Sequence, residues 1–370
     1  MRRIFSALVM LGAVAAFVPA GFAAAPIAEF TGGVVPSLAP MLTNITAGVV
    51  NIAVKGRVRE QNPLLQDPFF RRFFNVPQGQ GYQERETQAT GSGVIVDAAQ
   101  GYVLTNAHVV ENETSITVTT RDNHRYPAKL IGRDAETDVA VLKIETGHLT
   151  AVPLGDSDKL QVGDFVVAIG NPFGLGQTVT SGIVSALGRS GLGIEGYEDF
   201  IQTDASINPG NSGGALVDLH GELIGINTAI VAPGGGNVGI GFAVPISMAR
   251  RVMDQLVQYG EVKRGRIGVS IQDLTPDLAQ AMNTNRTSGA VIARVEPGSA
   301  AEHAGLKSGD LIVSANGVAM RDGTQLRNTI GLSRIGDEVK LVVDRGGSER
   351  AVAVKVEAAV LSSGKKAQER

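Results

Sequence analysis

Three side chains of the types used in nucleophilic catalysis each lie beside an apolar or glycine-rich run: His108, Asp138 and Ser212. The runs are residues 105–110, 137–142 and 210–214. A serine hydroxyl becomes an effective nucleophile when an imidazole takes its proton and a buried carboxylate orients that imidazole. Small residues around Ser212 allow a tight turn that can direct backbone N–H groups at a developing oxyanion. The three residues therefore predict a serine endopeptidase.

The histidine of this set is chosen by its surroundings. His108 follows a strand-like run at 101–104 and precedes the apolar pair Val109-Val110, so it suits a side chain presented at a strand end. We expect the remaining histidines, which lie in polar surroundings, to be solvated: His124, His148, His220 and His303. The chain order His, Asp, Ser is that of chymotrypsin-type hydrolases.

Two aspartates compete for the carboxylate role. Asp138 directly precedes the apolar run 139–142, where a carboxylate can be buried, whereas Asp134 lies among polar neighbours. We therefore assign the role to Asp138 and expect Asp134 to belong to a turn.

Composition limits the other functional classes. The chain has 370 residues, 43% of them apolar, which is enough for two or three domains with real cores. Its formal net charge of −3 offers no basic face for nucleic acid. Cysteine is absent, which excludes disulfides, metal–thiolate sites and a cysteine nucleophile. We expect no metal and no other cofactor.

Taken together, these segments resemble the HtrA/Deg family of serine endoproteases. The similarity rests on residues 105–110, 137–144, 155–158, 170–174 and 203–214. It implies that His108 is the general base, Asp138 its orienting partner and Ser212 the nucleophile. It also implies an oxyanion hole formed by the N–H groups of Gly210 and Ser212, with Asn211 between them.

The resemblance also indicates a specificity pocket. Ser206 occupies the position six residues before the nucleophile, where trypsin-like enzymes place an aspartate, so cleavage after Lys or Arg is disfavoured. The family's substrate-binding positions correspond to Ile207, Thr228, Ala229, Ile230 and Ile240. A pocket lined by these isoleucines favours a small aliphatic residue before the scissile bond. Alternatively, the isoleucines are ordinary barrel core.

Short β-rich runs separated by turn signals between residues 91 and 243 predict a mainly β fold of barrels or sandwiches. The resemblance makes this a chymotrypsin-like double Greek-key β-barrel over residues 49–260. His108 and Asp138 would lie on the first barrel and Ser212 on the second.

The N-terminus has the architecture of a signal peptide. A basic Met1-Arg2-Arg3 precedes an apolar run at 4–18 and small residues at 21–25, so we expect cleavage after Ala23 and export to the periplasm without a stable membrane span. An uncleaved anchor is the alternative, although the run is short of the ~20 residues that span a bilayer. In the resembling family, a segment such as 24–48 packs between the subunits of a homotrimer.

Residues 56–90 lack periodicity and predict a long regulatory loop. Four phenylalanines within residues 69–74 should be covered, either by the barrel or by another subunit.

An amphipathic pattern predicts a helix over 245–259, capped by Ser247 and ended by Gly260. Residues 261–357 resemble a small α/β PDZ domain, with a capping box at Ser299 and Glu302. A polar tail, 358–370, follows. PDZ domains bind peptides with free hydrophobic C-termini by strand addition. The resemblance places the carboxylate at Arg266, Ile267, Gly268 and Val269, and the side-chain pocket at Leu326 and Ile330. A spacer domain without a ligand is the alternative.

The function that these features imply is ATP-independent degradation of misfolded or unfolded periplasmic proteins. The single PDZ module keeps a regulatory, stress-sensing and site-specific protease as an alternative. A chaperone or peptide-binding protein with minor proteolysis is the third reading.

Overall fold

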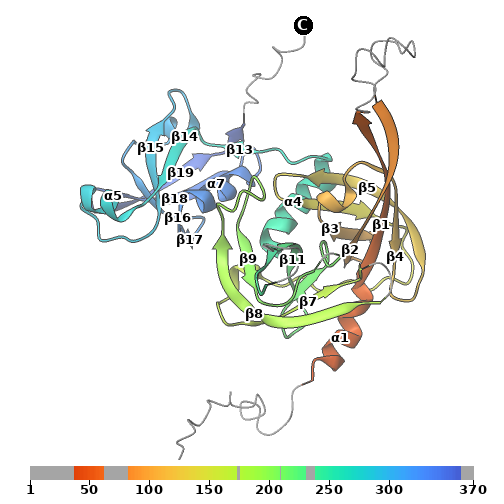
Figure 1. Ribbon diagram of the computed structural model, residues 1–370. Coiled ribbons are helices and arrows are strands. Elements are labelled where there is room, and N and C mark those ends of the chain that lie inside the picture. The colour runs from red at the N-terminus through yellow and green to blue at the C-terminus, as the bar shows by residue number, and fades with distance from the viewer. Residues whose placement is uncertain (1–36, 62–81, 173–175, 209, 231–237, 360–370) are drawn as a thin grey trace, which may run out of the picture. The chain divides into compact units, whose positions relative to one another are not determined.

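The computed structural model describes residues 37–61, 82–172, 176–208, 210–230 and 238–359. The expected leader at 1–23, the phenylalanine-rich block at 69–74 and most of the C-terminal tail lie outside these residues. In the described part of the chain, the strands form two closed barrels and a further sheet with short helices (Figure 1). The predicted mainly β architecture, two barrels followed by the small α/β domain that the sequence expects to be PDZ-like, is confirmed.

The first barrel closes in the order β1-β2-β3-β6-β5-β4. Its strands are β1 Val49–Gln61, β2 Tyr82–Asp97, β3 Tyr102–Thr105, β4 Glu113–Thr119, β5 Arg125–Asp134 and β6 Val139–Lys143. β-Branched residues that alternate along the strands, such as Val50, Ile52 and Val54, fill its interior. The barrel is preceded by α1 Ala39–Ile45 and the 3₁₀ turn η2 Thr46–Gly48.

The prediction that residues 56–90 form a loop is wrong at both ends of that range. β1 and β2 remain paired from Gly56 opposite Thr87 to Gln61 opposite Tyr82, and the pair leaves the barrel as a two-stranded ribbon (Figure 1). Antiparallel backbone pairing does not require apolar side chains, and the polar composition of this segment therefore concealed the strands.

The second barrel closes in the order β10-β11-β12-β9-β8-β7. Its strands are β7 Phe165–Gly170, β8 Thr178–Arg189, β9 Phe200–Thr203, β10 Ala215–Val217, β11 Leu223–Ile230 and β12 Gly241–Pro245. The 3₁₀ turn η4 Ser157–Lys159 precedes it. Its core includes Val166, Val184, Ile201 and Leu216.

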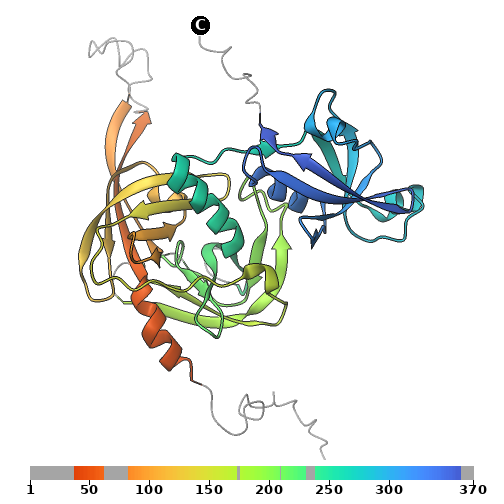
Figure 2. The same cartoon turned by 180° about the vertical axis from the view of Figure 1, so that it is seen from behind.

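The helix α4 Ile246–Tyr259 packs on strands of both barrels, namely β5, β6, β11 and β12 (Figure 2). It buries Met248, Val252 and Leu256, as the periodicity predicts. Ser247 is not its cap: Pro245 occupies that position, and the N–H of Ser247 donates to Oγ of Ser157 at 3.1 Å. Gly260 ends the helix with φ 76°.

The C-terminal elements form the PDZ domain. They are β13 Gly265–Arg266, β14 Val269–Asp273, α5 Pro276–Ala281, β15 Ala290–Val295, α6 Ala300–His303, β16 Leu311–Ala315, β17 Val318–Ala319, α7 Gly323–Gly331, β18 Glu338–Arg345, β19 Ser348–Lys355 and β20 Glu357–Ala358. The main sheet runs β14-β15-β16-β18-β19, so β14 is an edge strand. Ser299 caps α6 by accepting the N–H of Glu302, but the Glu302 carboxylate accepts the N–H of Gly298 at 2.6 Å. No helix within the described residues has the length and apolar character needed to cross a bilayer.

Candidate active site

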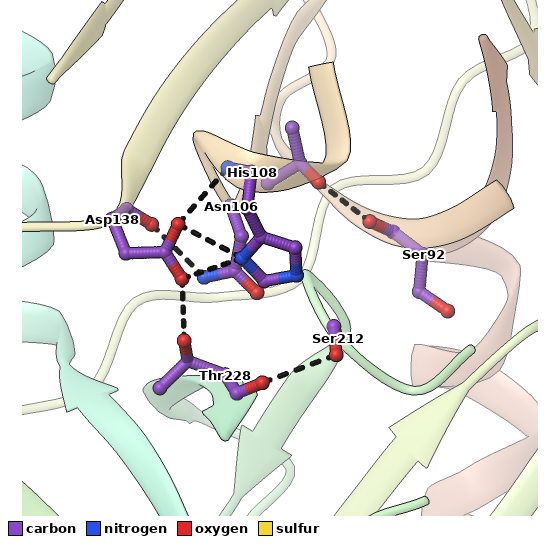
Figure 3. A network of polar contacts seen from close by, with 7 residues as sticks. Ser92, Asn106, His108, Asp138, Ser212 and Thr228 are labelled. Atoms are coloured by element: carbon purple, nitrogen blue, oxygen red, sulfur yellow. Dashed lines mark hydrogen bonds and ion pairs between the residues drawn. The ribbon is translucent and has the colours of Figure 1, made fainter. Parts of the chain in front are cut away.

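His108 and Asp138 are joined by a two-point contact on the first barrel. Nδ1 of the imidazole lies 2.9 Å from Oδ2 and 3.0 Å from Oδ1 of the carboxylate (Figure 3). The backbone N–H of His108 also donates to Oδ1 at 3.0 Å. These contacts fix the ring so that Nε2 is the nitrogen left for a substrate-side proton.

The local sequence places these two side chains. β3 ends at Thr105, and His108 opens the 3₁₀ turn η3 His108–Val110, whose Val109 and Val110 are buried in the barrel core. Asp138 adopts φ 53°, a left-handed conformation that aspartate tolerates better than most residues. The backbone carbonyl of Asp138 accepts a hydrogen bond from Nδ2 of Asn106 at 2.9 Å, and Asp138 is only 2% exposed.

Two opposing effects set the protonation of His108. Burial of the ring lowers its pKa, but the hydrogen bond and negative charge of Asp138, with smaller contributions from the charges of Glu195 and Glu111, outweigh burial. The pKa of His108 is therefore raised above its usual value of 6.5. A ring of this kind can accept a proton from a hydroxyl and hold it as an imidazolium.

Ser212 lies in a turn that leads into the second barrel. Gly210 (φ 96°) and Gly213 (φ 82°) adopt backbone conformations that suit glycine, and a Cβ at Gly213 would collide with the carbonyl of Ser92. The carbonyl of Asn211 accepts the N–H of Gly214 at 2.9 Å. Within the described residues, neither the Gly210 nor the Ser212 N–H donates to another group. These are the two N–H groups that the resemblance assigns to the oxyanion hole.

The hydroxyl of Ser212 is directed at Thr228. Ser212 Oγ donates to the carbonyl of Thr228 at 3.1 Å, and Oγ1 of Thr228 donates to Oδ2 of Asp138 at 2.5 Å (Figure 3). The pairing of β11 with β12 skips Thr228 between Asn227 and Ala229, so its carbonyl is not used by that strand pair. Across the described residues, no hydrogen bond joins Ser212 to His108, although the ring lies between Asp138 and Ser212 in Figure 3.

The competing carboxylate has another partner. Asp134 is the last residue of β5, and it is 9% exposed, so the expectation of an open turn is wrong. Its carboxylate accepts Oγ1 of Thr137 and forms an ion pair with Arg264, both at 2.6 Å. Arg264 lies far along the chain, and its pairing with Asp134 could not be read from local composition.

The predicted specificity residues lie in different surroundings. Ile207 is 1% exposed in the core of the second barrel, whereas Ile240 is half-buried just before β12. Ala229 and Ile230 belong to β11, but their side chains are not among those described. Asn211 is buried, and its Nδ2 has no partner in the described part of the chain.

The loop before β9 contributes charges that the sequence did not single out. Burial and the charge of Asp138 raise the pKa of Glu195 to about 7, against the opposing charge of His108. Glu198 organises the loop by accepting the N–H groups of Leu192, Ile194 and Glu195. The guanidinium groups of Arg264 and Arg327 lie over the ring of Tyr197, 4.3 and 5.1 Å from its centroid.

The PDZ residues surround a pocket of about 220 Å³. Five of the six predicted residues line it: Arg266, Ile267, Gly268, Val269 and Ile330. Leu326 does not line it, because its side chain is fully buried in the domain core. The resemblance placed both residues in the groove, and local sequence could not tell which of them faces the core. Tyr197 also lines the pocket.

Sequence reasoning missed Ser92, which contacts both ends of the Ser212 turn. It lies in a Gly91-Ser92-Gly93 run on β2. A small polar residue flanked by glycines within an apolar strand pattern was the available signal. Thr228 was expected only as a substrate contact, and its bond to Asp138 could not be inferred from residues so distant in sequence.

Comparisons with known proteins agree with this architecture. Residues 91–226 match the trypsin-like peptidase domain family, and residues 265–356 match the PDZ domain family. The chain is 49% identical over 332 residues to the periplasmic pH-dependent serine endoprotease DegQ of Escherichia coli, covering 89% of this chain and 72% of the relative. It is 48% identical over 344 residues to the periplasmic serine endoprotease DegP of Salmonella typhimurium, covering 87% and 72%. A solved structure of the HtrA-type protease AlgW with a decapeptide superposes with a TM-score of 0.63 at 44% identity, covering 88% of this chain and 99% of that one.

Proposed function

Because the chain belongs to the HtrA family of trypsin-like serine endoproteases, we propose that it cleaves unfolded or misfolded proteins in the periplasm. We assign the reaction to His108, Asp138 and Ser212. The observation that carries this assignment is the buried Asp138 carboxylate, which holds the imidazole beside the Ser212 turn.

The geometry supports the steps of acyl transfer. Ser212 Oγ attacks the scissile carbonyl while Nε2 of His108 takes its proton, and Asp138 stabilises the resulting imidazolium. The N–H groups of Gly210 and Ser212 receive the negative charge that develops on the carbonyl oxygen. His108 then protonates the leaving amine. Water attacks the acyl carbon while Nε2 of His108 takes its proton, and the carboxylic acid product leaves as that proton returns to Ser212 Oγ.

The PDZ domain is proposed to recognise the C-terminus of a peptide. β14 is the edge strand of its sheet, so it has an edge to which an extended peptide can add. The pocket beside it is lined by Ile267, Val269 and Ile330, which suits an apolar terminal side chain. Arg266 also lines it and forms an ion pair with Glu296 at 3.1 Å, which a terminal carboxylate would have to replace.

We further propose a protease domain at 49–260, a PDZ domain at 261–357, and a trimer built through the 24–48 segment. Of that segment, α1 and η2 are described, and Ile45 is its buried apolar residue. Light scattering at micromolar concentration tests the trimer, and a monomeric mass contradicts it.

The substrate class is tested with one protein presented in two states. A disulfide-rich protein that has been reduced and alkylated stays unfolded, whereas its native form hides the same peptide bonds. We expect rapid cleavage of the alkylated form and little cleavage of the native form. Equal cleavage of both forms would contradict a preference for unfolded chains.

A further inference from the structure

Ser92, a residue of the first barrel, makes hydrogen bonds to both ends of the turn that carries Ser212. Its N–H donates to the carbonyl of Ser212 at 2.8 Å, and its Oγ donates to the carbonyl of Gly210 at 2.6 Å. Ser92 itself is fully buried. We propose that Ser92 is a positioning residue for the oxyanion hole, an inference that rests on the proposed roles of Gly210 and Ser212.

The hydroxyl of Ser92 is held in a single orientation. It has one proton, which goes to Gly210, and its oxygen accepts the N–H of Asn171 at 2.8 Å. The carbonyl of Asn171 in turn accepts Nδ2 of Asn51 at 2.9 Å. All three residues are at least nine-tenths buried, where such bonds are stronger and each polarises the next.

Ser92 supplies bonds to two of three successive peptide units in the turn. In the peptide unit 210–211, the carbonyl of Gly210 accepts a hydrogen bond from Oγ of Ser92, and the N–H of Asn211 donates to the carbonyl of Asn208. In the peptide unit 212–213, the carbonyl of Ser212 accepts the N–H of Ser92, and the N–H of Gly213 donates to the carbonyl of Asn227. The unit between them carries the Ser212 N–H, so its direction follows from the two units that flank it.

The carbonyl of Ser92 makes a further hydrogen bond, on the histidine side of the site. Oγ1 of Thr105, three residues before His108, donates to the carbonyl of Ser92 at 2.7 Å. The strand that precedes the base and the turn that carries the nucleophile are thus bonded to the same residue. Ser92 therefore connects the first barrel to the turn that leads into the second barrel. The connection lies beside both the base that takes the proton and the N–H groups that receive the negative charge.

The hydroxyl of Ser92 therefore acts on the transition state. Substrate binding in the ground state uses strand edges and pockets, whereas the two N–H groups gain their full interaction when the carbonyl oxygen becomes an oxyanion. Loss of the hydroxyl leaves the Gly210 carbonyl without its donor and the Asn171 N–H without its acceptor. The turn can then rotate, so that the N–H groups of Gly210 and Ser212 no longer point at the oxyanion, although the Ser212 hydroxyl is still present.

The test compares Ser92→Ala with Ser157→Ala in the full-length protein. Ser157 is also a buried serine whose Oγ accepts a backbone N–H, from Ser247, so its variant controls for the loss of a buried hydroxyl. Removal of one oxyanion donor costs about 10²–10³ in kcat. For Ser92→Ala, which only misaligns such donors, we expect a kcat about 10- to 100-fold below wild type with KM within twofold. Ser157→Ala should retain the wild-type kcat.

A peptide boronic acid separates positioning from a general structural role, because its tetrahedral adduct places an oxygen where the oxyanion forms. Its inhibition constant should rise in Ser92→Ala by the same factor by which kcat/KM falls, and the acidic pH midpoint set by His108 should not move. Wild-type kcat in a folded Ser92→Ala protein, a loss confined to KM, or an unchanged boronate constant would each overturn the proposal.

Two controls keep the outcome interpretable. If Ser92→Ala does not fold, Ser92→Cys keeps the shape of the side chain with a slightly larger atom and a weaker donor. It should show the same parallel loss of kcat and boronate affinity, and wild-type values there would overturn the proposal. Ser212→Ala is measured alongside. Residual cleavage in Ser212→Ala refutes the proposed function itself, whereas an inactive Ser212→Ala with a normal Ser92→Ala refutes only the role of Ser92.

Discussion

The hydroxyl of Ser212 donates to the carbonyl of Thr228 at 3.1 Å, so the proposed nucleophile is hydrogen-bonded away from the base it must use. The hydroxyl of the same threonine donates to Asp138 at 2.5 Å. Thr228 thereby contacts both ends of the proposed catalytic unit, one through its backbone and the other through its side chain. Before reaction, Ser212 Oγ must leave this acceptor and turn to Nε2 of His108.

The side-chain contact of Thr228 should be measurable separately from its carbonyl. Thr228→Val removes the donor to Asp138 and keeps the shape, whereas Thr228→Ser keeps the donor. A hydrogen bond to a charged group contributes about 1.5–3 kcal/mol. We therefore expect kcat to fall by roughly 10- to 100-fold in Thr228→Val and by less than threefold in Thr228→Ser. Similar rates for the two variants in a peptide-cleavage assay would exclude a role for the hydroxyl.

Substitution of Asp138 should lower activity, whereas substitution of Asp134 should lower stability. Asp138→Asn favours the wrong imidazole tautomer and should lower kcat by about 10⁴. Asp134→Asn removes the charge opposite Arg264, so it should keep kcat within a few-fold but lower the free energy of unfolding, by on the order of 3 kcal/mol for a buried pair that loses one charge. Steady-state kinetics and urea denaturation measure the two effects. A larger kinetic defect in Asp134→Asn would reverse the assignment.

The pH dependence follows from the raised pKa of His108. The imidazole must be neutral to accept the serine proton, so activity is lost as the pH falls through its pKa. Because that pKa lies above 6.5, the acidic midpoint of kcat/KM should also lie above 6.5. Glu195→Gln removes a negative charge that raises the pKa of His108, and the midpoint should therefore move to lower pH. A midpoint at or below 6.5 in wild type, or an upward shift in Glu195→Gln, would contradict this electrostatic account.

Peptide recognition by the PDZ domain should depend on a free carboxylate. Amidation of the terminus removes the charge that backbone donors near Ile267–Val269 and the Arg266 side chain would bind. Binding should weaken by ~1.5–3 kcal/mol, as for a hydrogen bond to a charged group. Fluorescence anisotropy of matched acid and amide peptides measures the difference. If the two bind equally, the groove recognises another feature of the peptide.

The sequence predicted the fold where local patterns and long motifs agree. The short β-rich runs between residues 91 and 243 predicted barrel or sandwich strands, and the family resemblance predicted a double barrel. The β1–β2 ribbon was missed because its pairing is a property of the backbone. The cap prediction failed at Ser247 because the helix already begins at Ile246, with Pro245 at the N-cap position.

The site shows the same division. The residue types and order of His108, Asp138 and Ser212 carried the chemical prediction, and the structure brings His108 and Asp138 into contact. The supporting residues were not predictable in this way. Ser92 and Thr228 act through hydrogen bonds between segments that are far apart in the chain, and single-sequence patterns contain no information about such pairs.

The central claim is that His108, Asp138 and Ser212 act as one unit in peptide-bond cleavage. The most direct test is the turnover of unfolded casein by Ser212→Ala, His108→Ala and the double variant, each shown by circular dichroism to be folded. Loss of the nucleophile of such a unit costs about 10⁶ in kcat, and loss of the base costs nearly as much. We predict that both single variants are inactive to about this extent and that the double variant is scarcely worse. Cleavage that survives in Ser212→Ala, or losses that multiply in the double variant, would contradict the account.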